Sequence, residues 1–278
     1  MDAAATAAET VRANDRDRYL TALYAPADKR DALFALYAFN AEIAGVRDRI
    51  REAPPGEIRL QWWRDAIAAG GEGAGHPIAE ALIRTIREYN LPSAAFDNYL
   101  DARIFDLYDD PMPSRLDLEG YCGETAGAMI QLSAMILDPE AAPAHAELAG
   151  RAGCAQAITG VLRLLPLHRA RGQCFIPKDV LSAVGSSPEE FVSGDGKANA
   201  VQAVSAMIAL AREHLGAFDS GARALSRTLR PAFLPLALTR AYLDRLARDP
   251  GRALVAPPDI LEWRRHWLLL RHATRGWT

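Results

Sequence analysis

The stretch AGCAQAITGVLRLLPLHRARGQCFIPKDVL, residues 152–181, is the part of the sequence that says most about the fold. Apolar residues recur in its first half at steps of three and four, the spacing of one face of an α-helix. Gln156, Thr159 and Arg163 form a polar stripe on this predicted helix. Pro166 is expected to kink or end the helix, because proline lacks an amide hydrogen. A polar stripe on an apolar helix fits a pocket wall or a hydrogen-bonded structural network, and periodicity leaves both open.

The same helical periodicity continues along most of the chain. Alanine, leucine and arginine, all strong helix formers, dominate the composition. Proline and glycine separate the periodic segments, and helices are expected at about residues 14–24, 28–50, 57–69, 78–89, 93–108, 117–137, 145–165, 200–217, 220–229, 232–247 and 258–271. No window alternates convincingly as a strand does, and no long linker divides the chain. We therefore predict one all-α domain over residues 14–278, preceded by a loose N-terminal segment, residues 1–13.

Length and composition exclude several classes of protein. The 278 residues, half of them hydrophobic, can bury a large core, which argues against a disordered chain. A net charge of −3 does not suit a nucleic-acid coat, so we expect no nucleic-acid partner. The three cysteines form no CxxC pair, which argues against a zinc site and a disulfide framework. No apolar run reaches the roughly 20 residues of a spanning helix, and MDAAATAAET lacks the features of a signal peptide.

Two further motifs each allow a functional and a structural interpretation. The glycine-rich segment Gly70–Gly75 follows a predicted helix rather than a strand, which favours a helix–helix loop over a phosphate-binding loop. Asp97 and Asp101 stand one helical turn apart, a spacing that allows two carboxylates to share a Mg²⁺ ion. The alternative, which we favour, is a solvated acidic face near Arg103.

The C-terminal segment PPDILEWRRHWLLLRHATRGWT, residues 257–278, mixes tryptophan with arginine. A helix of this composition can rest on an anionic membrane surface. It can equally pack its tryptophan and leucine face on the protein core. We favour packing and keep the membrane surface as the alternative.

Three stretches together resemble the squalene/phytoene synthase family of head-to-head prenyl synthases. They are KRDALFALYAFNAEIAGVRD with the following LQWWRDAI, then GYCGETAGAMIQL, then AQAITGVLRLLPLHRARGQCFIP, at residues 29–48, 60–67, 120–132 and 155–177. Their order and spacing agree with the family over nearly the whole chain. The resemblance implies a single-domain, all-α isoprenoid-synthase bundle around a central cavity.

Enzymes of this family carry two DxxxD motifs. The motifs hold Mg²⁺ against a prenyl diphosphate, because loss of that leaving group needs metal ions on its phosphate oxygens. Here the first motif falls on residues 44–48 and keeps only Asp48, and the second falls on residues 164–168 and keeps neither aspartate. Leu164 has no donor atom, and neutral His168 is a poor ligand for so hard an ion. We therefore expect no catalytic residues, no bound metal and no cofactor.

The stretches that contain these altered motifs resemble one subfamily in particular. AFNAEIAGVRD and LRLLPLHRARGQCFIP, residues 38–48 and 162–177, closely resemble the non-catalytic subfamily typified by the mitochondrial complex I assembly factor of squalene/phytoene synthase type. The resemblance implies a protein that assists assembly of respiratory NADH dehydrogenase (complex I). Its implied partners are complex I subunits or other assembly factors, with a prenyl or phosphorylated lipid as a candidate ligand. The residues expected to line the vestigial substrate pocket are Arg30, Tyr37, Asp48, Gln156, Arg163, His168 and Arg171.

Two other functions stay open at this point. One is an active, Mg²⁺-dependent squalene or phytoene synthase whose metal is mounted elsewhere, for example on Asp97 and Asp101. The other is a lipid-handling protein that lies on a membrane surface through the C-terminal helix. For the leading interpretation, we expect a bacterial cytoplasmic protein that touches the inner membrane at its periphery.

Overall fold

A computed structural model of the chain describes residues 2–50, 52–70 and 75–277. Helices and their connections account for this part of the chain, and no strand occurs in it, which confirms the predicted all-α class. The chain divides into two compact units that interleave along the sequence. Unit 1 comprises Met1–Tyr108, Ala128–Ala146 and Leu225–Pro235, and unit 2 comprises Asp109–Gly127, Glu147–Ala224 and Leu236–Thr278. Within the described ranges, no helix combines the length and apolarity needed to cross a bilayer.

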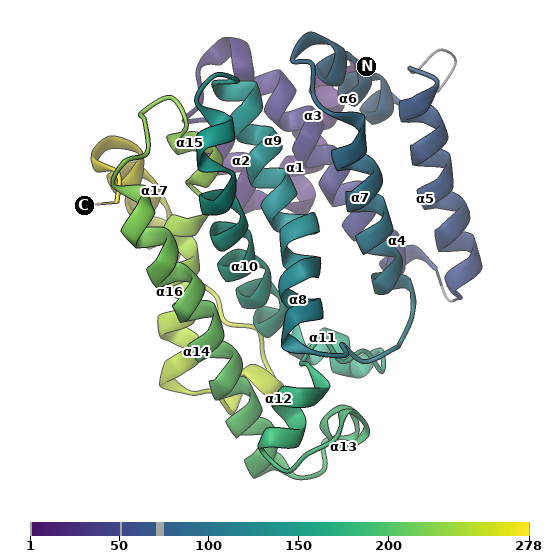
Figure 1. The fold of residues 1–278 in the computed structure, drawn as a ribbon, viewed down its shortest axis with the longest axis vertical. Coiled ribbons are helices and arrows are strands. Elements are labelled where there is room, and N and C mark those ends of the chain that lie inside the picture. The colour runs from purple at the N-terminus through teal and green to yellow at the C-terminus, as the bar shows by residue number, and fades with distance from the viewer. Residues whose placement is uncertain (1, 51, 71–74, 278) are drawn as a thin grey trace. The chain divides into compact units, whose positions relative to one another are not determined.

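Unit 1 consists mainly of the N-terminal helices. They are α1 (Ala3–Asn14), α2 (Arg16–Ala22), α3 (Ala27–Ala44), α4 (Val46–Arg49), α5 (Ala53–Ala68), α6 (Pro77–Glu88) and α7 (Ser93–Ile104). The short turn η1 (Phe105–Leu107) follows α7, and α9 (Ala128–Leu137), η3 (Ala142–His145) and α15 (Arg230–Phe233) complete the unit. In Figure 1, α1 and α3 lie side by side, with α6 beside them, and the three pack on one another.

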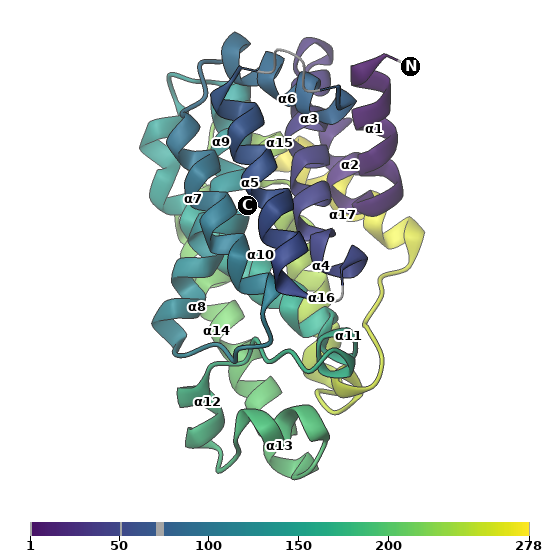
Figure 2. The same ribbon diagram turned by 90° about the vertical axis from the view of Figure 1, so that its right-hand side faces the viewer.

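The first residues form a packed helix, so the prediction of a loose segment at residues 1–13 is wrong. Asp2 caps α1 by accepting a hydrogen bond from the Ala4 amide. Ala7 and Val11, one turn apart, are fully buried in the core of unit 1. Helix α1 packs against α3 and α6 (Figures 1 and 2). Burial of an alanine-rich face therefore fixes a segment that composition alone suggested would be loose.

The core of unit 1 is centred on Phe39 of α3. Its ring lies 5.1 Å from Trp63, 5.7 Å from Phe96 and 5.3 Å from Tyr99, ring centre to ring centre. Trp63 belongs to α5, and the other two rings belong to α7, which packs along α5 (Figure 2). The aromatic cluster therefore ties three helices together at the inner face of α3.

Unit 2 begins with α8 (Arg115–Cys122), which continues as a π-helical turn, η2 (Gly123–Gly127). Its other elements are α10 (Ala146–Arg163), α11 (Leu165–Ala170), α12 (Lys178–Ala183), α13 (Pro188–Ser193), α14 (Lys197–Ala222), α16 (Leu236–Arg248), η4 (Arg252–Leu254) and α17 (Glu262–Arg275). As predicted, the helix through Gln156 ends just before Pro166, which occupies the first turn of α11.

Two glycines allow η2 and α10 to pack so closely that their backbones are in contact. A Cβ atom placed on Gly153 would lie 2.3 Å from the Gly127 nitrogen and 2.4 Å from the Gly127 Cα. No side chain fits into so short a gap. Gly127, the last glycine of GYCGETAGAMIQL, and Gly153 of α10 therefore have a structural purpose, which is close helix packing.

Some predicted boundaries differ from those in the structure. The expected helix at 28–50 is interrupted at Gly45, and the expected separate helix at 220–229 is wrong because α14 runs on to Ala222. The prolines at 54 and 55 lie inside the first turn of α5, where proline is tolerated because first-turn amides need no helical acceptor.

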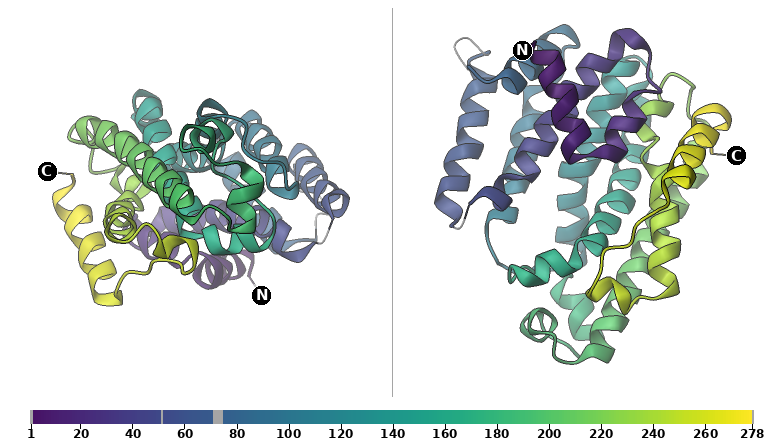
Figure 3. Two further views of the ribbon diagram at one scale, coloured as in Figure 1. Left: turned by 90° about the horizontal axis from the view of Figure 1, so that it is seen from below. Right: turned by 180° about the vertical axis from the view of Figure 1, so that it is seen from behind.

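The C-terminal helix packs with a different face from the one expected. Arg265 and Leu269 are its buried residues, and Trp263 and Trp267 are exposed, so the prediction that the tryptophan face packs on the core is wrong for these two. Arg265 takes the inner position because the Tyr242 hydroxyl on α16 accepts a hydrogen bond from it at 3.1 Å. Helices α16 and α17 lie side by side in Figure 3.

Candidate functional site

Tyr37 is the predicted pocket residue that lies deepest in unit 1. It is 2% exposed, and its hydroxyl lies 3.2 Å from that of Ser133 on α9. The guanidinium of Arg18 lies 5.8 Å from the centre of the Tyr37 ring, and Asp15 pairs with that arginine at 2.6 Å. Burial raises the pKa of Tyr37, which keeps its hydroxyl protonated. Tyr37 is thus part of a buried polar network that joins α2, α3 and α9.

A second buried network crosses from α3 to α7. The Tyr99 hydroxyl donates to Asn40 Oδ1 at 2.9 Å and accepts from Arg103 Nε at 3.2 Å. Arg103 in turn pairs with Asp106 at 2.8 Å. Burial raises the pKa of Tyr99. Asn40 and Tyr99 were not predicted from the sequence, although an asparagine among Leu33, Leu36, Ile43 and Val46, apolar residues at helical spacing, was a signal for such a network.

We expect Tyr99→Phe to destabilise the protein by about 1–3 kcal/mol. The substitution leaves Asn40 Oδ1 without its hydrogen-bond donor and Arg103 Nε without its acceptor inside the core. Chemical denaturation of both proteins measures the difference. Tyr19→Phe is the matched control, because the Tyr19 ring stacks on Phe34 at 5.4 Å and the contact needs no hydroxyl. Equal losses in the two variants would contradict the network.

The remaining predicted residues of unit 1 lie elsewhere on its helices. Arg30 is half-buried near the start of α3, where its Nε donates to the Ala25 carbonyl at 3.0 Å. It lies two helical turns from Tyr37 on the same helix. Asp48 lies on α4 with its side chain exposed. Arg30 and Tyr37 therefore meet different partners within the unit.

In unit 2, Arg163 at the end of the polar stripe of α10 contacts α16. The guanidinium of Arg163 lies 3.7 Å from the centre of the Tyr242 ring, which is cation–π contact. The hydroxyl of Tyr242 accepts a hydrogen bond from Arg265 at the same time. Gln156, two turns earlier, is half-buried, and within the described chain its Oε1 accepts no hydrogen bond. Tyr242 was not predicted, since nothing in its local sequence separates it from other core tyrosines.

His168 and Arg171 follow on α11 and at its C-terminal end. The His168 ring lies 4.6 Å from that of Phe175, and Phe175 lies 6.0 Å from Tyr121. Backbone hydrogen bonds hold the segment before α12 in place, since Met112 N donates to Cys174 O at 2.9 Å. Arg171 is half-buried, and its amide donates to the His168 carbonyl at 3.0 Å. The structure thus brings His168 into an aromatic cluster.

The sequence matches the model of one known protein family. The squalene/phytoene synthase model matches residues 11–271, which is nearly the whole chain. The chain belongs to the squalene/phytoene synthase family. The family resemblance inferred from the sequence is thereby confirmed.

Known proteins of two kinds are similar to this family member. It is 32% identical to the mouse (Mus musculus) "NADH dehydrogenase (ubiquinone) complex I, assembly factor 6" over 86% of this chain and 72% of that protein. It is 30% identical to a presqualene diphosphate synthase of Rhodopseudomonas palustris over 58% of this chain and 57% of that enzyme.

A solved structure of a dehydrosqualene synthase with a ligand shares the fold. It superposes with a TM-score of 0.81 at 18% identity, over 98% of this chain and 95% of that one. The fold of the squalene/phytoene synthase family is therefore shown for this chain, as the sequence predicted.

The residues at the two family motifs do not fit Mg²⁺. The positions that the family resemblance assigns to the four motif aspartates hold Ala44, Asp48, Leu164 and His168. Asp48 contributes the only carboxylate, whereas Mg²⁺ prefers six oxygen ligands in octahedral geometry. The Leu164 side chain is 47% exposed and has no donor atom, and the His168 ring lies against Phe175. Alanine, leucine and histidine at three of these positions do not supply the oxygen ligands that Mg²⁺ prefers.

The acidic pair on α7, the alternative metal mount, faces an arginine. Asp97 Oδ1 lies 4.0 Å from Arg64 Nε, and Asp101 is ion-paired with the same guanidinium. Both aspartates are largely exposed, as a solvated face requires. The ion-pair partner of this face is Arg64 of α5, which was not predicted from the sequence. Arg103 is engaged by Asp106 instead.

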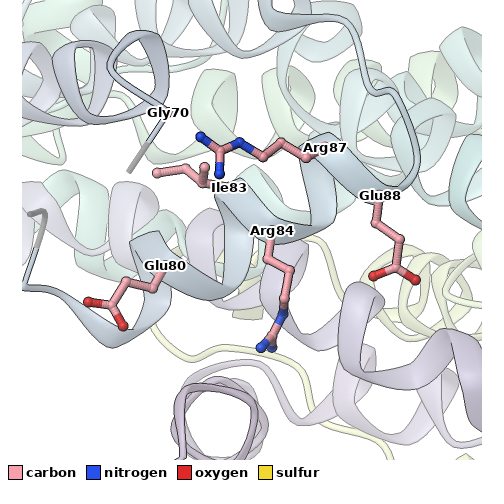
Figure 4. A pocket seen from close by; sticks show the side chains of 6 residues that line it. All are labelled: Gly70, Glu80, Ile83, Arg84, Arg87 and Glu88. Atoms are coloured by element: carbon pink, nitrogen blue, oxygen red, sulfur yellow. The ribbon is translucent and has the colours of Figure 1, made fainter. Parts of the chain in front are cut away.

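A surface pocket of about 560 Å³ lies on α6 (Figure 4). Two arginines, two glutamates, one isoleucine and one glycine line it: Gly70, Glu80, Ile83, Arg84, Arg87 and Glu88. The mixture of charges and the single apolar wall are not typical of a small-molecule site. None of the predicted pocket residues lines it. Of the glycine-rich segment, residues 71–74 lie outside the described residues, so the expected loop there stays a prediction.

Proposed function

We propose that this squalene/phytoene synthase family member assists the assembly of respiratory complex I and does not couple prenyl diphosphates. The observation that carries the proposal is its similarity to the complex I assembly factor, which extends over 86% of the chain. Similarity to the presqualene diphosphate synthase, at nearly the same identity, covers only 58%. The partners we propose are complex I subunits or other assembly factors.

The chemistry of the motif positions supports the non-catalytic half of the proposal. Ionisation of a prenyl diphosphate requires metal ions that neutralise the leaving group. Arginine and histidine side chains can hold an anion by charge-assisted hydrogen bonds, yet they supply no Lewis acid. In this chain Arg163 lies on Tyr242, and His168 lies on Phe175. These positions thus serve packing, and any bound prenyl or phosphorylated lipid would be held without reaction.

We expect purified protein to form no head-to-head product from farnesyl or geranylgeranyl diphosphate in the presence of Mg²⁺. The reason is the loss of three of the four carboxylates that mount the metal. Product analysis by chromatography, with a presqualene diphosphate synthase as the positive control, measures the outcome. Turnover that a chelator abolishes would contradict the proposal and favour the enzyme alternative, for which the Arg64-paired Asp97 and Asp101 offer no support.

A further inference from the structure

The C-terminal helix α17 exposes a row of large apolar side chains. Trp263 is 68% exposed, and Trp267 and Leu270 are each 53% exposed. Spacings of four and three residues place the three along one side of the helix. Leu261, just before the helix, is also exposed and adds an apolar group at that end. Scattered surface apolar residues need no explanation, but a row with two tryptophans marks an interaction surface.

The opposite side of α17 is fixed to unit 2. Arg265 is 6% exposed and donates to the Tyr242 hydroxyl, and it pairs with Asp259 at 3.1 Å. Leu269 is fully buried one turn later. Trp277, beyond the end of the helix, packs edge-on against Phe218 of α14 at 5.3 Å. These contacts fix the inner side of α17 to unit 2. The exposed row of apolar side chains therefore lies on a helix that is held in place.

Positive charge borders the row on one side. Arg264, Arg271 and Arg275 follow one another at helical spacing beside the tryptophans. The Arg271 guanidinium lies 5.5 Å from the centre of the Trp267 ring. Among the described residues, no carboxylate forms an ion pair with any of these three arginines. The one acid of the helix, Glu262, is paired with the buried Arg265. This local positive charge stands out on a chain whose net charge is −3.

We propose that α17 docks on an anionic lipid surface. Tryptophan and leucine side chains enter the boundary between headgroups and acyl chains, where the amphipathic indole ring is favoured. The flanking arginines then meet lipid phosphates, and each basic residue strengthens binding to an anionic leaflet. The helix lies in the plane of the surface and does not span it. The inference concerns where the protein acts and does not depend on the proposed assembly role.

A second copy of the chain fits this surface less well. In a two-fold symmetric dimer the same patch meets itself, so the unpaired arginines of one copy would face those of the other. Like charges brought together without carboxylates between them oppose such a contact. The surface therefore calls for a partner that is both apolar and anionic, which describes a bilayer rich in acidic phospholipid.

Flotation of the full chain with lipid vesicles tests the proposal. We expect binding to phosphatidylcholine vesicles that contain about 30% phosphatidylglycerol, with little binding to phosphatidylcholine alone. Trp263→Ser/Trp267→Ser and Arg264→Glu/Arg271→Glu should each lower the partition coefficient by about tenfold or more. Raising NaCl from about 0.05 M to about 0.5 M should weaken binding of the unmodified protein, because salt screens exposed charges.

Matched controls come from exposed sites on unit 1. Ile58→Ser removes an apolar side chain that is 72% exposed on α5, and Arg84→Glu/Arg87→Glu reverses two exposed charges on α6. Both controls should bind vesicles as the unmodified protein does. Absence of flotation, or equal flotation of the α17 variants and the controls, would overturn the proposal. Self-association that the double tryptophan variant abolishes, without vesicle binding, would assign the surface to a second copy instead.

Discussion

Gly153→Ala is expected to destabilise the protein by about 3 kcal/mol, at the upper end of the usual range for overpacking. The new Cβ atom would lie 2.3 Å and 2.4 Å from backbone atoms of Gly127, far inside van der Waals contact. Backbone atoms cannot rotate away as a flexible side chain can. Helix α10 would therefore have to move away from the turn η2, and the surrounding core of unit 2 would lose contacts with it.

Gly160→Ala on the same helix provides the control. A Cβ atom at position 160 meets nothing within 4 Å, so the substitution adds only helix propensity. We expect it to stabilise the protein by about 0.5–1 kcal/mol. Urea denaturation of both variants and of the unmodified chain measures the two changes, which should have opposite signs. A Gly153→Ala protein as stable as the Gly160→Ala protein would contradict the close approach of η2 and α10.

Deletion of the gene from its host is expected to remove most assembled complex I. The proposed role predicts this loss, since a complex whose assembly lacks a required step is not completed. Squalene- and phytoene-derived lipids should be unchanged, because in the proposed function the chain does not couple prenyl diphosphates. NADH oxidation by membranes and extraction of isoprenoids measure the two quantities in parallel. Loss of isoprenoids with normal NADH oxidation would support the enzyme alternative.

The helical class could be predicted from the sequence because apolar residues recur at helical spacing over nearly the whole chain. The end of the helix before Pro166 followed from the chemistry of proline and is confirmed. The packing of α1 could not be predicted in this way. Its buried residues, Ala7 and Val11, form only a short apolar stripe, and their burial depends on α3 and α6.

The buried face of α17 also could not be predicted from the sequence. Tryptophan is usually buried more readily than arginine, yet here Arg265 is inside and Trp263 is outside. The inner position suits arginine because Tyr242, Asp259 and Glu262 surround it with acceptors. Tyr242 belongs to α16 and Asp259 precedes α17, so periodicity within α17 carries no information about these two partners.

For the candidate site too, one part could be predicted from the sequence and another part could not. The polar stripe of α10 was visible in the sequence, and both a pocket wall and a structural network were open. The structure places Arg163 on Tyr242, a contact with a distant helix that local spacing cannot reveal. The resemblance to a known family assigns the two metal motifs to residues 44–48 and 164–168, and the residue types at positions 44, 164 and 168 can be read directly from the sequence.

The amount of complex I resolved on native gels from a complemented deletion strain tests the central claim most directly. We predict that this chain restores the complex and that a presqualene diphosphate synthase expressed in its place does not. The enzyme is named for the synthesis of a prenyl diphosphate, whereas this chain holds a single aspartate at the four positions that the family resemblance assigns to the metal motifs. Rescue by the enzyme, or a normal level of complex I in the uncomplemented deletion strain, would contradict a role in assembly that is independent of prenyl coupling.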